Sequence, residues 1–335
     1  MSDNGSYFQT TYQIRINNPV MKGYAMAGAN LPAKKYSKTS PTVLRLSFES
    51  TGSGTKFIDI ARALSTINRK FYRQGVYYYV NSVELYNNSD GVVDIHTIPD
   101  TWITKNAWNR GFGIFQKMNN LSDTPRPKYH DFKVRMISTH AADGSNTMDP
   151  DVYSINGTNA SISPDEWKYS EITTMHSDGG LPDEFTLTML GGHVGAQGNR
   201  DSVGLIKSYA ETRPYPISTG QPALLNPPHD DPLKNLFDAS GDNALENIAQ
   251  NLDENNDQTP YDHNAYLGFS GSHMQHVARL ATTPTIGRIA KASGFCAPFG
   301  LICVDAHPTI AGDDNWRVVI NLAAGTYHGV YAERA

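Results

Sequence analysis

The sequence predicts a mainly β protein, an antiparallel β-sandwich of the jelly-roll type with long loops and two or three short helices. Three observations support this fold class. Many short segments alternate apolar and polar side chains, clusters of Gly, Pro, Asn and Asp separate them, and few segments show helical periodicity. Roughly eight or nine such strands are typical of two packed antiparallel sheets.

The clearest strands form a hairpin over residues 75–98. Residues 75–86 are rich in tyrosine and valine, which favour a pleated, half-buried surface. A turn follows at 87–91, where Asp-Gly tolerates positive φ, and residues 92–98 return as a second strand that ends before Pro99. Strict alternation predicts two largely apolar faces and hence a central strand: Val76, Tyr78, Val80 and Ser82 on one face, Tyr77, Tyr79, Asn81 and Val83 on the other.

Further strands are predicted along the rest of the chain by the same alternation. They cover residues 42–50, 131–139, 184–190, 202–210, 299–306, 316–324 and 327–334. The glycine-rich residues 191–198 are interpreted as a loop between two of these strands, because their spacing does not fit a dinucleotide-binding loop.

Three segments show helical periodicity. Residues 56–68 place their apolar side chains on one face, and residues 101–118 place Trp108, Phe112 and Phe115 at the spacing i, i+4 and i+7. Residues 244–252 form the third, where Asn243 and Glu246 fit a capping box.

The predicted domain organisation is an N-terminal arm, residues 1–41, followed by a single jelly-roll domain, residues 42–335. The 335 residues are 39% hydrophobic and 18% charged, which is typical of an ordered soluble protein. No secretory signal and no membrane span is predicted. Two inserted loops, 141–168 and 211–262, are longer than connectors need to be, so we expect them to make external contacts.

The net charge of −5 is unevenly distributed. Residues 1–42 carry five basic residues against Asp3, whereas residues 211–270 carry ten acidic residues against two basic ones. A basic segment can meet phosphates, so the predicted nucleic-acid-binding residues are Arg15, Lys22, Lys34, Lys35 and Lys38. The alternative is a lightly charged, solvated tail.

No catalytic motif is apparent. Residues 268–272 lack the final glycine of a nucleophile elbow, and His273 and His276 have no further zinc ligand at matching spacing. The acidic residues 253–257 lack the order of a calcium loop. Cys296 and Cys303 are interpreted as small buried residues. The sequence therefore predicts no enzyme, no cofactor and no metal site, and it favours self-association or partner binding.

Three stretches carry a resemblance to a known family. Residues 97–120, 127–136 and 317–335 resemble segments of capsid proteins from small circular, Rep-encoding single-stranded DNA viruses. The resemblance implies a subunit of the virion that assembles in many copies into an icosahedral shell around a viral genome of single-stranded DNA. Such proteins often begin with a dense Arg/Lys arm, whereas this chain has only the sparse lysines of residues 33–38.

Two other classes of function stay open. The first is a jelly-roll recognition module that binds glycan or a cell surface through Tyr- and Asn-rich loops. The second is a hydrolase whose active site is assembled from distant loops, because the fold alone does not define the chemistry.

One prediction concerns packaging. If the arm binds the genome, the five basic residues give a salt dependence with a slope of roughly −3.5 on single strands. Replacing Lys34, Lys35 and Lys38 with alanine should lower the packaged nucleic acid and leave empty shells intact, measured as the absorbance ratio of purified particles. If the triple variant packages as much nucleic acid as the wild type, these lysines do not line the interior surface of the shell.

Overall fold

The computed structural model describes most of the chain beyond Ser40. The described residues are 41–120, 129–138, 140, 146–153, 159–162, 167–174, 183–196, 199–212, 267–269, 273–283, 288–307, 310 and 315–335. The chain divides into two units, 1–40 and 41–335, and the described residues all belong to the second. The predicted helix 244–252 lies outside the described residues.

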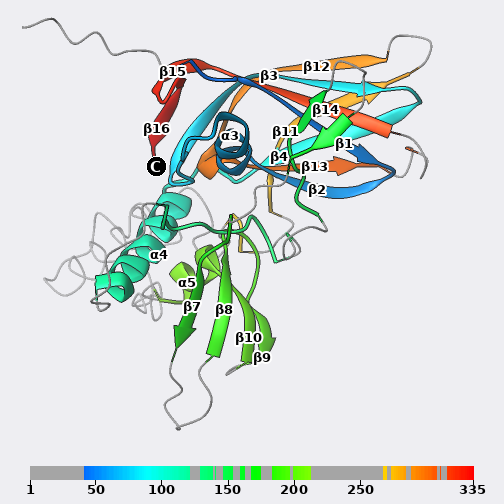
Figure 1. Cartoon of the computed structure of the whole chain (residues 1–335). Coiled ribbons are helices and arrows are strands. Elements are labelled where there is room, and N and C mark those ends of the chain that lie inside the picture. The colour runs from blue at the N-terminus through cyan, green and yellow to red at the C-terminus, as the bar shows by residue number, and fades with distance from the viewer. Residues whose placement is uncertain are drawn as a thin grey trace, which may run out of the picture. The chain divides into compact units, whose positions relative to one another are not determined.

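Two antiparallel sheets form a sandwich (Figure 1). The first sheet has the order β1 (Arg45–Thr51), β14 (Asn315–Leu322), β3 (Val76–Asn87), β12 (Ile289–Ala297), and β16 (Ala332–Arg334) also pairs with β3. The second sheet has the order β11 (Gln275–Thr282), β4 (Gly91–Thr97), β13 (Leu301–Ala306), β2 (Gly54–Asp59).

The strand pairing is nested. Strand β1 pairs with β14, and the next pairs inward along the chain are β2 with β13, β3 with β12 and β4 with β11. This order results when one long antiparallel hairpin is wrapped into two layers, which is the topology of a jelly roll. The predicted fold class is confirmed. Residues 98–274 are inserted at the tip of this hairpin, between β4 and β11.

The sandwich core lies between the two sheets. Its largest side chains are fully buried, among them Phe48, Tyr78 and Trp316. The Trp316 indole donates a hydrogen bond to the carbonyl of Gly52 at 2.8 Å, so this large ring is buried without an unsatisfied polar group. The second sheet contributes β-branched residues such as Ile95 and Val304 to the same core.

Strand β3 is central, as predicted, but its two faces differ from the prediction. The register between β3 and β14 shifts between Val80 and Ser82, which leaves Asn81 as an extra, exposed residue. The bulge reverses the alternation, so Val83 and Leu85 join Val76, Tyr78 and Val80 in the core. Strict alternation placed Ser82 on the face of Val80 and Val83 on the opposite face, which was wrong.

The outer face of β3 is only partly covered. Tyr77 is 5% exposed and packs on the ring of Phe299, with 5.5 Å between ring centroids. Tyr79 is partly exposed, with its ring 4.7 Å from that of Tyr331. The prediction of a strand covered on both sides therefore holds for Tyr77 but not for Tyr79 and Asn81.

The insertion contains the remaining elements. They are α4 (Trp102–Asn120), β5 (Asp151–Tyr153), β6 (Asn159–Ser161), β7 (Glu171–Thr174), β8 (Asp183–Thr188), β9 (Val194–Ala196), β10 (Asn199–Gly204) and α5 (Leu205–Glu211). Strands β7, β8, β10 and β9 form a separate small sheet in which β8 and β10 are parallel. A second apolar cluster joins the insertion to the sandwich, since Trp108 of α4 stacks on Phe299 with ring centroids 4.3 Å apart.

Several predicted boundaries were wrong. Residues 56–68 were predicted as one helix, but 54–59 are strand β2 and only α3 (Ile60–Asn68) is helical, because the Asp59 side chain caps it by accepting from Arg62 N at 3.1 Å. The predicted strand 202–210 is β10 up to Gly204 and then helix α5. Residues 131–138 form no strand of a sheet and contribute one isolated bridge, from Arg135 to Thr188.

The C-terminal prediction was partly right. Strand β14 agrees with the predicted 316–324, and the predicted 327–334 became a tight hairpin of β15 (Ala324–Tyr327) and β16. His328 and Gly329 form its turn with φ of 50° and 99°. Strands β11 and β12 were not predicted, because their exposed positions blur the alternation.

A glycine comparison tests the packing beneath β3. Gly300, in the short 3₁₀ turn Pro298–Gly300, has φ +69°, and a Cβ there would lie 2.9 Å from the buried Tyr78 ring. Gly300→Ala should lower the free energy of unfolding by about 2 kcal/mol or more, measured by chemical denaturation.

Gly113→Ala is the matched control. This glycine lies in α4 with open space around its Cβ position, so alanine should stabilise the chain by about 0.5–1 kcal/mol. Equal stability of the two variants would contradict the packing described around Tyr78.

Candidate functional site

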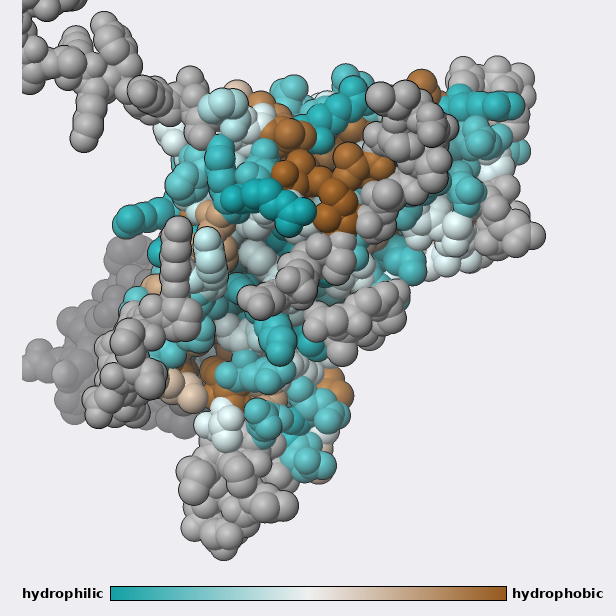
Figure 2. All heavy atoms as spheres, in the orientation of Figure 1, coloured by the Kyte–Doolittle hydropathy of each residue, from teal (hydrophilic) through white to brown (hydrophobic). Residues whose placement is uncertain are grey.

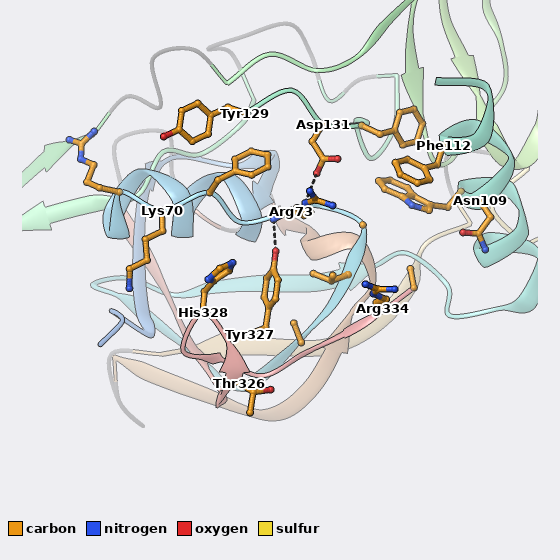
Figure 3. Close-up of a pocket in the computed structure, with 18 residues that line it drawn as sticks. Lys70, Arg73, Asn109, Phe112, Tyr129, Asp131, Thr326, Tyr327, His328 and Arg334 are labelled. Carbon is orange, nitrogen blue, oxygen red and sulfur yellow. Dashed lines mark hydrogen bonds and ion pairs between the residues drawn. The ribbon is translucent and has the colours of Figure 1, made fainter. Parts of the chain in front are cut away.

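A cavity of about 1190 Å³ lies at one end of the sandwich, and we call it the cationic cavity. Four elements line it: the segment after α3, one face of α4, residues 129–132 and the C-terminal hairpin (Figure 3). The lining residues that matter below are Arg69, Lys70, Phe71, Arg73, Trp108, Phe112, Tyr129, Asp131, Tyr327, His328 and Arg334.

Local hydrogen bonds hold the segment after α3 against the C-terminal hairpin. Helix α3 ends at Arg69, whose φ of 51° turns the chain out of the helix. Tyr72 then donates its hydroxyl to the carbonyl of His328 at 3.0 Å, and Tyr327 Oη accepts from Arg73 N at 2.9 Å. The bond between Tyr327 and Arg73 is drawn in Figure 3. These bonds hold residues 69–73, which carry three basic side chains, beside the C-terminal hairpin, which carries Arg334.

The cavity is positively charged. Four basic side chains line it, and among the described lining residues Asp131 is the one acidic side chain. Arg73 Nε lies 3.8 Å from Asp131 Oδ2, and the arginine side chain is 64% exposed. Burial raises the pKa of Asp131, which the neighbouring Arg73 opposes. Arg69 and Arg334 are both exposed at the surface.

Aromatic rings lie between these cations. Phe71 and Tyr129 meet edge to face, with ring centroids 5.8 Å apart, and Tyr129 is 59% exposed. Phe71 also faces the ammonium group of Lys133, 5.9 Å from the ring centroid. Cations that alternate with exposed rings can bind a polyanion that carries flat groups, through charge and stacking together.

A second polar cluster surrounds Asp94 on the second sheet. Arg279 binds both carboxylate oxygens of Asp94, at 2.8 and 2.7 Å. His307 Nε2 lies 2.7 Å from the same carboxylate and His276 Nε2 lies 3.4 Å from it. The hydrogen bonds from Arg279 hold the pKa of Asp94 well below its usual range, although burial opposes them.

The Asp94 cluster gives His276 a structural role that the sequence did not predict. Its ring lies 5.2 Å from that of His96, and burial lowers the pKa of His96. Within the part of the chain that the structure describes, no group of three or more His, Cys, Asp or Glu side chains is placed to hold a metal ion.

The predicted nucleic-acid-binding residues lie outside the described residues: Arg15, Lys22, Lys34, Lys35 and Lys38. The predicted loop 211–262 lies outside them beyond Thr212, and so does half of the predicted loop 141–168, whose described half contains β5 and β6. Cys303 is buried as predicted and Cys296 is partly buried, and burial raises the pKa of their thiols to about 12 and about 11.

Sequence reasoning missed the cationic cavity. Its signal is the stretch Arg69-Lys-Phe-Tyr-Arg73, in which three basic residues flank two aromatic ones just after a predicted helix that was recognised only by its apolar face. Arg334 lies far along the chain, so no local pattern links it to Arg69.

Comparisons with protein-family models, curated proteins and solved structures find no match to this chain. Among the described helices, none is long and apolar enough to cross a membrane.

The Asp94 cluster generates a stability prediction. The Asp94 side chain is 7% exposed and accepts from several groups at once, which a neutral amide cannot do. Asp94→Asn should lower the free energy of unfolding by about 1–3 kcal/mol at pH 7, measured by urea denaturation. Glu49→Gln is the control, because the Glu49 side chain is 23% exposed against 7% for Asp94, and its pair with Arg317 should contribute less than about 1 kcal/mol.

The pH dependence of this difference follows from the sign of the shift. The pKa of Asp94 is lower in the folded state than its ordinary value of 3.8, so its stabilising effect is present above that value and disappears as the pH falls below it. The stability difference between wild type and Asp94→Asn should therefore shrink below about pH 4. A difference that stays constant down to pH 2 would contradict the assignment.

Proposed function

We propose that this protein is a structural capsid subunit that assembles into a closed shell around a viral genome, for which the resemblance implies single-stranded DNA. The observation that carries the proposal is the nested jelly-roll pairing of eight strands, an architecture used by viral capsid proteins. Lectin domains and cupins share this architecture, so the fold supports the proposal only together with the sequence resemblance and the surfaces described below.

The three resembling stretches come together in space. Trp108 and Phe112 belong to residues 97–120, Tyr129 and Asp131 to residues 127–136, and the C-terminal hairpin to residues 317–335. All three stretches line the cationic cavity (Figure 3). Segments that are distant along the chain but adjacent in space are what a shared structural unit would preserve, which supports the resemblance.

The surface offers contacts for neighbouring subunits. Helix α4 exposes Trp102 by 49%, Ile114 by 43% and Met118 by 37%. Among the described strands, β12 and β11 are the edges of the two sheets on one side of the sandwich, and β12 exposes Ile289 by 60%. Exposed edges and apolar side chains favour association, and the subunits of a shell can cover them.

An apolar surface area is also visible in Figure 2, in the part of the picture where Figure 1 draws α3 and the sandwich strands. Contiguous apolar surface is typical of protein contacts.

The recognition-module alternative predicts small oligomers, so particle size separates it from the capsid proposal.

Assembly is the direct test. Size-exclusion chromatography with light scattering, followed by negative-stain imaging, should show closed particles of megadalton mass. Small oligomers at every ionic strength and concentration tested would contradict the capsid proposal and favour a recognition module.

One variant tests the role of α4. Ile114→Glu adds a carboxylate to the exposed apolar face of the helix and should reduce the particle fraction at unchanged melting temperature. Gln116→Glu is the matched control, because it adds the same charge at an exposed position of the same helix and should assemble normally. Normal assembly of both variants would remove α4 from the subunit contacts.

A further inference from the structure

We infer that the cationic cavity binds a segment of single-stranded nucleic acid, with phosphates on its cations and an unstacked base against its exposed aromatic rings. The inference rests on the proposed function, since it assigns the genome contact of the shell to a particular place on the folded domain. It adds a site beyond the basic residues of the N-terminal arm.

The size of the cavity favours a polymer over a small molecule. Sites for small molecules usually measure about 300–1,000 Å³ and are mostly apolar. This cavity has about 1190 Å³ and is lined by four basic side chains. A short stretch of a strand fills such a space, and successive phosphates can each meet a cation.

The arrangement of charges fits a strand that passes through the cavity. In Figure 3, Lys70 lies on one side of Tyr327 and Arg334 on the other, with Arg73 between them. Arg73 already has a partner in Asp131, so Arg69 and Arg334 are the cations with the most to gain from a phosphate. One guanidinium group can donate two parallel hydrogen bonds to a phosphate, which gives geometric specificity.

The aromatic rings favour single strands over a duplex. Tyr129 is 59% exposed at the rim of the cavity and is braced edge to face by Phe71. A base can stack on such a ring only after it has left its own stack, and single strands supply such bases without a cost of unpairing. Every base has a flat face, so this mode is tolerant of sequence, as packaging of a whole genome requires.

Residues that are close in sequence to the cavity are also basic. The carbonyl of Pro41 lies 2.9 Å from Lys70 Nζ, so the chain joins the folded domain at the edge of this cavity. The sequence just before it carries Lys34, Lys35 and Lys38. Further basic residues of the same chain increase the attraction for a polyanion, and a comparison with heparin distinguishes nucleic acid from a sulfated glycan.

The experiment measures the binding of a fluorescein-labelled oligothymidylate to the full chain by anisotropy, in the subunit fraction from size-exclusion chromatography. Arg69→Gln combined with Arg334→Gln should weaken binding and lower the slope of log K against log salt by about 1.4, since each lost phosphate contact removes about 0.7. Tyr129→Ala should weaken binding about tenfold with little change in that slope.

Lys117→Gln combined with Lys168→Gln is the matched control. Both lysines are exposed and lie outside the cavity lining, so the double variant changes the net charge equally. It should leave the slope at the wild-type value. An equal loss of slope in both double variants would mean that net charge alone governs binding, and it would overturn the inference.

Two further outcomes are decisive. If heparin binds with a dependence on Arg69 and Arg334 and the oligothymidylate does not, the cavity binds sulfated glycan and the inference is wrong.

Particle formation is measured on the same samples, as is the nuclease-protected nucleic acid of any particles. Cavity-dependent DNA binding without particles contradicts only the capsid proposal, whereas particles with cavity-independent binding contradict only the inference.

Discussion

The nested pairing of the strands is the constraint on which the rest of the structure depends. Strand β14 lies between β1 and β3, so the first sheet is complete only when residues from both ends of the domain have met. Such contacts are long in sequence and require loop closure before they stabilise anything. The same pairing brings the C-terminal hairpin to the end of α3, where Tyr327 and His328 accept hydrogen bonds from the segment that lines the cationic cavity.

The fold class was predictable because the alternation of side chains is a local property. Residues 75–98 and 316–322 kept their predicted strands, since β-branched and aromatic side chains at alternating positions fit a two-layer core. Strand β3 shows the limit of this reasoning. Its bulge at Asn81 depends on the register of a partner strand more than two hundred residues away, and no pattern within 75–86 indicates it.

The candidate site was less predictable than the fold. The sequence indicated a basic N-terminal segment because charge can be counted along a chain, and it missed Arg69 and Arg334 because only the fold brings both to the lining of one cavity. The same is true of the Asp94 cluster, whose members come from β4, β11 and the end of β13. Strands that are adjacent in a sheet but distant in sequence create such clusters, so they follow from the topology and not from any motif.

A buried amide connects the insertion to the sandwich. Gln74 is fully buried, donates to the carbonyl of Val134 at 2.8 Å and accepts from Val134 N at 2.6 Å. Its amide also donates to Asp59, the cap of α3, at 3.1 Å. Burial raises the pKa of Asp59 to about 6, because it disfavours the charged form, while the hydrogen bond from Arg62 N opposes this shift.

One side chain therefore holds together the start of α3 and two segments that border the cationic cavity, namely the segment that follows α3 and residues 131–134. A buried amide with both of its ends bonded tolerates few alternative positions, because each lost bond would leave a buried polar group unsatisfied. The cations of the cavity are exposed and long, but the backbone that carries Arg73 on one side and Asp131 on the other is held by this bonded core. The geometry of the cavity is thus set by the interior of the domain, and a ligand that binds there meets a site whose backbone is already in place.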